Sequence, residues 1–200
     1  MTSEGTDTTD APSDDGRFAL RVRGGWPEGW SLPVDNLPRS AWPTHPNFAG
    51  LTAYWLERHA LFRELISRIG GDCDGVATGA LEPATFGHRL ARLGGMLLNQ
   101  LHSHHQVEDE HYFPLLVQRE PALARGFEIL ERDHLVIADW LAQFAERSNT
   151  LLATLASPTF KTADAEAYRD WLVAFTPLLD RHLSDEEDLV IPLLLRDGEG

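Results

Sequence analysis

The chain of 200 residues has 42% hydrophobic residues and a net charge of −14 at pH 7. This length and apolar content can bury one core, so we expect a single structural domain with some length left for a tail. The acidic balance argues against nucleic acid or an anionic membrane surface as a partner, because either would require a basic patch.

The single cysteine, Cys73, excludes an intramolecular disulfide. It stands among glycines and acids, a composition typical of an exposed loop, and such cysteine usage fits a reducing compartment. The N-terminus has acids where a signal peptide has basic residues, and no apolar run reaches the ~18 residues of a transmembrane helix. We therefore predict a cytoplasmic protein that does not insert into a membrane.

The N-terminal part of the chain divides into two segments. Residues 1–16 are rich in Ser, Thr, Asp and Gly and have almost nothing to bury, which predicts a disordered acidic tail. In residues 17–46, Trp26, Trp30 and Trp42 alternate with prolines. Prolines oppose helix and regular sheet, whereas aromatic residues at this density seldom remain in water. We expect an extended arm packed on the body of the protein.

Residues 47–196 have apolar residues at helical spacing, which predicts four long helices. Gly70–Gly71 is a typical stop for the first helix. In the second helix, Leu115 and Leu116 are expected on the buried face, and Pro177 predicts a kink in the fourth. Short connections favour an all-α, up-down-up-down four-helix bundle. The predicted helices span residues 47–69, 83–118, 121–155 and 159–195.

A histidine and a glutamate four residues apart occur in the second and again in the fourth predicted helix. His104 and Glu108 align without a gap on His182 and Glu186, and a Pro-Leu-Leu run follows each pair at the same distance. Residues four apart share one helix face, and apolar neighbours turn this face towards the core. A buried carboxylate is costly unless it is paired or bound to a cation, and imidazole with carboxylate suits a transition metal.

A single histidine precedes each of these motifs. His59 lies 45 residues before His104, and His134 lies 48 residues before His182. A lone histidine in an apolar pattern is ordinarily a core residue bonded to a carbonyl, but the repeated spacing favours a metal ligand. The pattern is that of a duplicated helical hairpin. The six predicted ligands are His59, His104, Glu108, His134, His182 and Glu186.

Six ligands are too many for one zinc ion, which prefers about four, and the imidazole content is wrong for calcium or magnesium. Two ions bridged by carboxylates fit best, with iron favoured and manganese or zinc as alternatives. A core without metal would leave two buried glutamates with few basic partners. A ferritin-like site is a further alternative, because Glu131-x-x-His134 and Glu108-x-x-His111 have its spacing, but it needs glutamates on the remaining helices.

These motifs resemble those of the hemerythrin-like, or HHE cation-binding, family. The resemblance covers residues 47–196 and rests on the runs 104–114, 131–134 and 182–187. It implies a four-helix bundle around two iron ions (Fe²⁺/Fe³⁺) with an oxo or hydroxo bridge. Members of the family bind dioxygen or sense oxygen, iron or nitric oxide, and some decompose peroxide.

The chain departs from the oxygen-carrying members of this family at one position. They place a second histidine four residues after the one on the third helix, where this chain has Ala138. His105 and His111 are both candidates to replace it. His105 resembles in position an additional carboxylate of some relatives, and His111 lies one turn beyond Glu108. If neither binds, open positions on the metal favour reactivity over reversible carriage.

The remaining acids near the motifs are expected to have other roles. Glu187 could replace its neighbour Glu186 as the carboxylate ligand, and Asp133 is expected to orient a ligand. The acids expected to form a solvated face are Asp109, Glu110, Glu187 and Asp188.

The predicted function is that of a non-haem di-iron protein that binds dioxygen or a related small oxidant, for sensing, storage or scavenging. The first alternative is an enzyme that decomposes peroxide or reduces nitric oxide at the same centre. The second is a metal-regulated module in which the arm or the acidic surface binds a protein partner.

Overall fold

The computed structural model describes residues 16, 18–26, 37–48 and 50–198. The described residues form helices and connections and contain no strand, so the predicted all-α class is confirmed. None of the helices in this part of the chain combines the length and the apolar character needed to cross a membrane. The predicted tail, Gly16 apart, and residues 17 and 27–36 of the predicted arm, with Trp30, lie outside the described residues.

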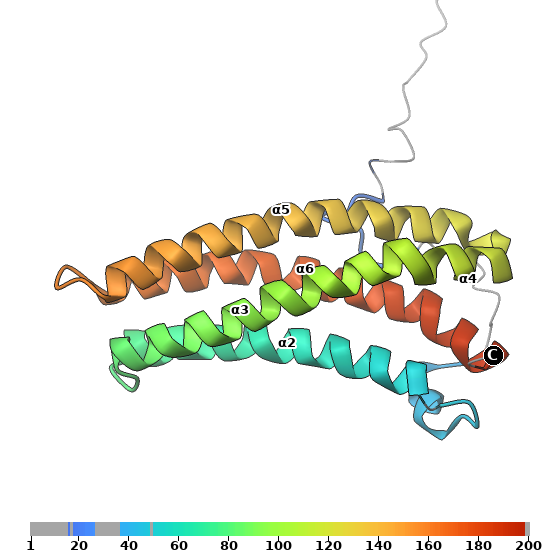
Figure 1. Ribbon diagram of the computed structural model, residues 1–200, viewed down its shortest axis with the longest axis horizontal. Helices are drawn as coiled ribbons and strands as arrows, with labels where there is room; N and C mark the ends of the chain where they lie inside the picture. The colour runs from blue at the N-terminus through green and yellow to red at the C-terminus, as the bar shows by residue number, and fades with distance from the viewer. Residues whose placement is uncertain (1–15, 17, 27–36, 49, 199–200) are drawn as a thin grey trace, which may run out of the picture.

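Four long helices lie side by side and build the bundle (Figure 1). In the order of the chain, each runs opposite to the one before it, so that α2 and α5 point one way and α3 and α6 the other. The helices are α2 (Gly50–Ala77), α3 (Pro83–Val107), α5 (Ala124–Leu155) and α6 (Thr162–Asp197).

The predicted second helix is interrupted by one π-helical turn, η2 (Glu108–Tyr112), before it continues as α4 (Phe113–Arg119). A π turn holds more residues than an α turn, so it rotates everything that follows it about the helix axis. As a result Phe113 is fully buried, whereas Leu115 is 51% exposed. The prediction that Leu115 faces the core was therefore wrong, although Leu116 is buried as expected.

Helix α2 does not end at Gly70–Gly71 but continues to Ala77. The predicted helix end and the predicted exposed loop around Cys73 were both wrong, because Cys73 is fully buried. Ile69, Cys73 and Val76 continue the buried stripe at spacings of four and three residues, and this packing keeps the glycine pair helical. The chain leaves the helix at Gly79, whose φ of +73° suits a residue without a side chain.

The apolar core consists of two clusters with a polar layer between them. One cluster fills the end of the bundle near the α2–α3 and α5–α6 connections and includes Phe86 and Phe144. The other surrounds α4 and the last turns of α6 and includes Trp55, Phe113 and Phe127. The buried histidines and carboxylates lie along the helices between these clusters.

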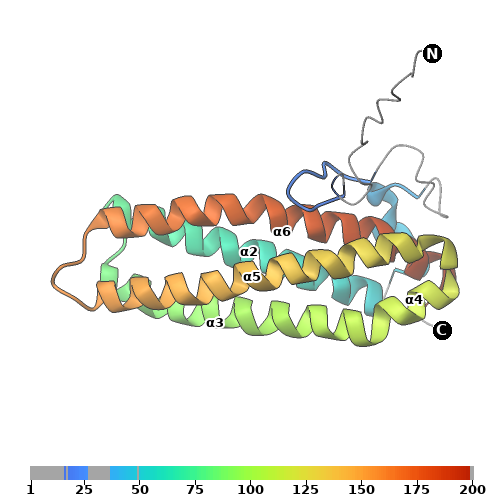
Figure 2. The same cartoon turned by 90° about the horizontal axis from the view of Figure 1, so that it is seen from above.

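Part of the segment before the bundle packs against it. Leu20 joins the first apolar cluster, and Trp42, in the short helix η1 (Arg39–Thr44), joins the second. The indole nitrogen of Trp26 donates to the backbone carbonyl of Asp185 in α6 at 2.9 Å. Figure 2 shows residues 18–26 against α6, over the half of the bundle that holds α4.

The two neighbouring glycines of α3 provide a matched test of core packing. A Cβ on Gly94 would lie 3.2 Å from Cε1 of the buried Phe144, whereas one on Gly95 would meet nothing within 4 Å. Alanine is a better helix former than glycine, so Gly95→Ala should raise the free energy of unfolding by ~0.5–1 kcal/mol. In Gly94→Ala, overpacking costs ~1–3 kcal/mol and should make the net change destabilising. Urea unfolding of the two variants measures both effects, and equal stabilisation would contradict this packing.

Candidate metal centre

The polar layer brings together side chains from all four long helices and from the π turn. All of them are buried except His104, which is nearly so. They form two adjoining groups. Within each group, the ligand atoms all lie within 4.8 Å of one another. The first group is His59, His104, Glu108 and Glu186, and the second is His105, His134 and His182.

In the first group, nitrogens from two helices face each other and two carboxylates. The Nε2 atoms of His59 in α2 and His104 in α3 lie 3.0 Å apart. His104 Nε2 lies 2.9 Å from Oε1 of Glu108, and His59 Nε2 lies 3.3 Å from Oε1 of Glu186. Four donor atoms at such distances, two of them nitrogen and two oxygen, suit a single metal ion.

The second group contains three imidazoles from three helices. The rings of His105 in α3 and His134 in α5 stack with their centroids 4.0 Å apart, and the ring of His182 in α6 stands edge-on to both. His134 Nε2 lies 3.6 Å from Oε2 of Glu108, and His182 Nε2 lies 3.4 Å from Oε2 of Glu186. Each glutamate therefore presents one oxygen to each group.

The buried atoms of this layer fit a pair of cations, because many of them have no other partner. A buried polar atom without a hydrogen bond is costly, and two carboxylates facing each other are more so. A pair of metal ions would bind these donors and neutralise the two carboxylates together. Within this layer, the buried side-chain atoms for which the described residues provide no hydrogen-bond partner are His105 Nε2, Glu108 Oε1 and Oε2, His134 Nε2, His182 Nε2 and Glu186 Oε2.

Burial keeps several of the imidazoles neutral, the form that binds metal. It lowers the pKa of His104 to about 3, and it also lowers the pKa values of His105 and His182. Burial and the charge of Glu186 raise the pKa of Glu108 well above its usual value. For Glu186, burial acts in the same direction, but His59, whose own pKa is raised by its carboxylate neighbours, outweighs it and lowers the pKa of Glu186. In the absence of a cation, the two carboxyl groups thus differ in their preference for a proton.

Two of the histidines contact a carboxylate through Nδ1, the ring nitrogen that does not face Glu108 or Glu186. His134 Nδ1 lies 2.7 Å from Oδ1 of Asp109, and His182 Nδ1 lies 3.4 Å from Oδ2 of Asp133. Such a contact fixes the tautomer and the orientation of a metal-binding imidazole. The predicted orienting role of Asp133 agrees with this geometry, whereas the prediction that Asp109 belongs to a solvated face did not foresee its contact with His134.

Glu187 does not face either group but holds His59 from outside. Its Oε1 lies 2.9 Å from His59 Nδ1 and accepts a hydrogen bond from Arg63 Nη1 at 2.8 Å. Burial opposes ionisation, but the contacts with His59 and Arg63 lower the pKa of Glu187 to about 2. Its prediction as a solvated acid was wrong, because only 3% of the residue is exposed. Glu186, not Glu187, points into the layer.

Two other candidates from the sequence lie outside the layer. His111 is exposed on the π turn, and Glu131 is exposed on α5. Neither belongs to the two groups of donor atoms. Of the two histidines considered as replacements for the one missing at Ala138, the structure therefore brings only His105 to the centre. The ferritin-like alternative loses its support, since it required Glu131 and His111.

Trp55 is a contact of the centre that the sequence did not reveal. Its indole nitrogen donates to Oε1 of Glu186 inside the buried layer. Its ring also packs edge-on against Tyr112 of the π turn, with centroids 5.0 Å apart. The sequence placed Trp55 on the inward face of its helix, but periodicity alone cannot show which buried residue an indole nitrogen will meet.

One cavity leads to the centre. It has a volume of about 230 Å³, lies between α2 and α3, and reaches His104 and Glu108 of the first group. Trp55, Tyr112 and Ser103 also line it. The first group has two histidines where the second has three, so the cavity opens on the group with fewer imidazoles.

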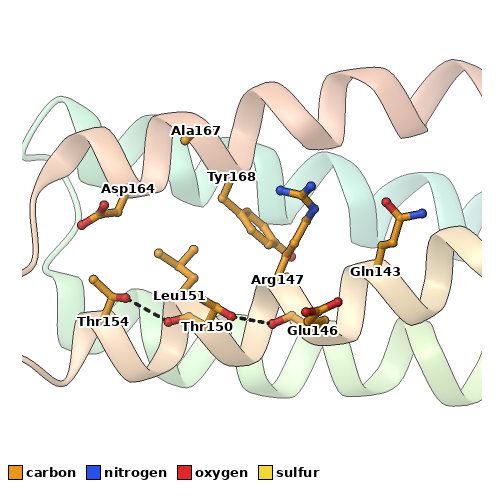
Figure 3. Close-up of a pocket in the computed structure, with 9 residues that line it drawn as sticks. All are labelled: Gln143, Glu146, Arg147, Thr150, Leu151, Thr154, Asp164, Ala167 and Tyr168. Carbon is orange, nitrogen blue, oxygen red and sulfur yellow. Dashed lines mark hydrogen bonds between the residues drawn. The ribbon is translucent and has the colours of Figure 1, made fainter.

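A larger groove of about 470 Å³ lies between α5 and α6, towards the α5–α6 connection (Figure 3). Its polar groups are engaged locally, since the hydroxyl of Thr150 donates to the carbonyl of Glu146 and that of Thr154 to the carbonyl of Thr150. None of the histidines or carboxylates of the two groups lines it. This groove is therefore separate from the candidate metal centre.

Comparison with protein families matches residues 50–194 to the hemerythrin HHE cation-binding domain. The chain belongs to the hemerythrin HHE family. The resemblance seen in the sequence is thus confirmed, and the helical bundle is compatible with the hemerythrin fold. No curated protein and no solved structure gives a significant match. This hemerythrin-like domain has cation binding as its family property, and the histidine and glutamate cluster is compatible with it.

Replacing His105 or His111 tests which of them completes the centre. His105→Ala removes one of three imidazoles from the second group, so it should lower the Fe²⁺ content of the purified domain. His111→Ala removes an exposed ring and should leave the metal content unchanged. Metal analysis after anaerobic equilibration with Fe²⁺ makes the comparison. A loss of metal in His111→Ala alone would contradict the assignment.

Proposed function

We propose that this domain holds two iron ions and uses them to bind dioxygen or a related small oxidant in the cytoplasm. The observation that carries the proposal is the position of the two glutamates. Glu108 and Glu186 each place one carboxylate oxygen near the first group of histidines and the other near the second. Carboxylates in this arrangement suit a pair of ions that share both of them.

The nitrogen-rich donor set supports iron over the other metals considered. Five imidazoles and two carboxylates exceed what one zinc ion takes, and calcium and magnesium prefer oxygen. Iron accepts this mixture, and manganese or zinc would be weaker alternatives. When bound, the two ions would supply one-electron redox chemistry at a position accessible to a small molecule.

The residues of the chain prepare the centre for that chemistry. His59 and His104 would hold the first ion and His105, His134 and His182 the second, with Glu108 and Glu186 shared. Asp109, Asp133 and Glu187 fix three of the rings from behind. The apolar clusters on both sides keep bulk water away, so a small oxidant would reach the ions mainly through the cavity lined by Ser103 and Tyr112.

The iron content and its redox behaviour test this proposal. Protein expressed in iron-enriched medium and purified anaerobically should contain two iron ions per chain by metal analysis and Mössbauer spectroscopy. Exposure to air should then produce a visible absorption band. His134→Ala should lower the iron content, whereas His88→Ala, an exposed histidine of α3, should not. A colourless, iron-free wild-type protein would contradict the proposal.

The unequal histidine content of the two groups favours turnover of peroxide or nitric oxide as a second candidate function. The first group has two imidazoles and borders the cavity, so a ligand there would meet an ion with fewer protein ligands. This geometry favours reaction over reversible carriage. A protein whose stability depends on metal but whose metal has no redox chemistry would instead support the regulated binding module.

A large side chain in the cavity should slow the entry of a small oxidant to the centre without changing how much metal the protein binds. Ser103 lines the cavity, whereas Asn99, one turn earlier on the same helix, does not. Ser103→Trp should therefore slow the reaction of the iron-loaded protein with hydrogen peroxide while its iron content stays at the wild-type level. Asn99→Trp is the matched control. Stopped-flow absorption measures both rates, and equal rates would exclude this cavity as the route.

A further inference from the structure

The segment before the family match reaches the metal centre through one buried arginine. Arg23 lies outside residues 50–194, and only 1% of its side chain is exposed. Its Nε donates to Oδ2 of Asp185 at 2.6 Å, and its Nη2 donates to Oδ2 of Asp133. A guanidinium group has its donors in a rigid plane, so contacts with two carboxylates fix both of them relative to each other.

The contact between Arg23 and Asp133 continues into the centre. The same oxygen of Asp133 that accepts from Arg23 lies 3.4 Å from Nδ1 of His182. The other nitrogen of His182, Nε2, has no hydrogen-bond partner and lies 3.4 Å from Oε2 of Glu186. A continuous chain of contacts therefore joins the N-terminal segment to the second group of ligands.

We propose that Arg23 is a positioning residue of the metal centre. It fixes Asp133, and Asp133 in turn fixes the ring of His182 so that Nε2 points to the ion. The inference rests on the proposed function for the presence of the ion, but the contact chain exists without it. The N-terminal segment is then part of the centre, although the family match begins after it.

Several contacts other than those to the carboxylates hold Arg23 in place. The backbone carbonyl of Phe18 accepts from Arg23 Nη1 at 2.6 Å, and Leu20 is buried in the first apolar cluster. On the other side, Arg181 Nη1 donates to the carbonyl of Gly24 at 3.1 Å. The guanidinium group therefore approaches Asp133 on a backbone that is anchored before and after it.

A second arginine before the bundle, Arg39, contacts a carboxylate next to the first group of ligands. An arginine of α2 contacts the same carboxylate. Arg39 donates to Glu187, the carboxylate that holds His59. Arg63 also donates to Glu187, and 43% of the Arg39 side chain is exposed. Loss of Arg39 should therefore matter less than loss of Arg23, because Arg63 still holds the carboxylate.

The first experiment measures Fe²⁺ affinity by anaerobic competition with a chelator. Arg23→Met should weaken binding by about 10- to 100-fold, the range found when an outer partner of a metal ligand is removed. Arg23→Lys should recover only part of this loss, because one ammonium group cannot hold both carboxylates in the same way. Arg21→Met is the matched control, since Arg21 is exposed on the same segment. Wild-type affinity in Arg23→Met would overturn the proposal.

A double-mutant cycle with Asp133→Asn separates positioning from a general structural role. If Arg23 acts through Asp133, the Arg23→Met/Asp133→Asn protein should lose no more Fe²⁺ affinity than the weaker-binding single variant. Losses that add would mean that Arg23 acts elsewhere and would overturn the proposal. If Arg23→Met does not fold, the cycle is made with Arg23→Lys.

A measurement on the metal-free protein distinguishes failure of this inference from failure of the proposed function. The Nδ1–H proton of His182 faces Asp133 and should give a slowly exchanging NMR signal in wild type and Arg21→Met. This signal should be lost in Arg23→Met and weakened in Arg23→Lys. A wild-type protein that takes up no Fe²⁺ would refute the iron centre alone, whereas an unchanged His182 signal in both Arg23 variants would refute the positioning role.

Discussion

The structure depends on how two buried carboxylates are compensated. Glu108 and Glu186 lie between two apolar clusters, where an isolated charge is strongly disfavoured. Five imidazoles surround them, and burial keeps three of these rings, His104, His105 and His182, neutral. His59 differs, because its carboxylate neighbours raise its pKa, and it faces Glu186. A bound cation would add positive charge beside these carboxylates, in line with the cation binding of the family.

The outer contacts follow from the same constraint. Asp109, Asp133 and Glu187 orient histidines, but each adds a further negative charge near the layer. Arg23 forms an ion pair with Asp133, and Arg63 forms one with Glu187. The arginines come from the N-terminal segment and from α2, so the charge balance of the centre links the bundle to the chain that precedes it.

Much of the fold and of the candidate site could be predicted because both depend on periodicity. Apolar spacing gave the helices, and two aligned histidine–glutamate pairs placed His104, Glu108, His182 and Glu186 on inward faces. The π turn could not be predicted, because the choice between α and π hydrogen bonding depends on tertiary packing. It also explains why Leu115 is exposed.

The remaining errors have similar physical causes. Glycines and acids around Cys73 suggested a loop, but the packing of α2 overrides local helix propensity. Arg23 lies in a segment without regular spacing, so nothing in the sequence connected it to Asp133. Periodicity indicates which face of a helix is inward, but it does not identify contacts between segments far apart in the chain.

The burial of Cys73 has a consequence for a protein whose centre would meet oxidants. Burial and the neighbouring acids raise the pKa of this thiol to about 12, so almost none of it is thiolate at neutral pH. The thiolate, not the thiol, is the nucleophile that attacks a peroxide to give sulfenic acid. The chain's one sulfhydryl is thus shielded from sulfenic acid formation and from cross-linking to a second molecule.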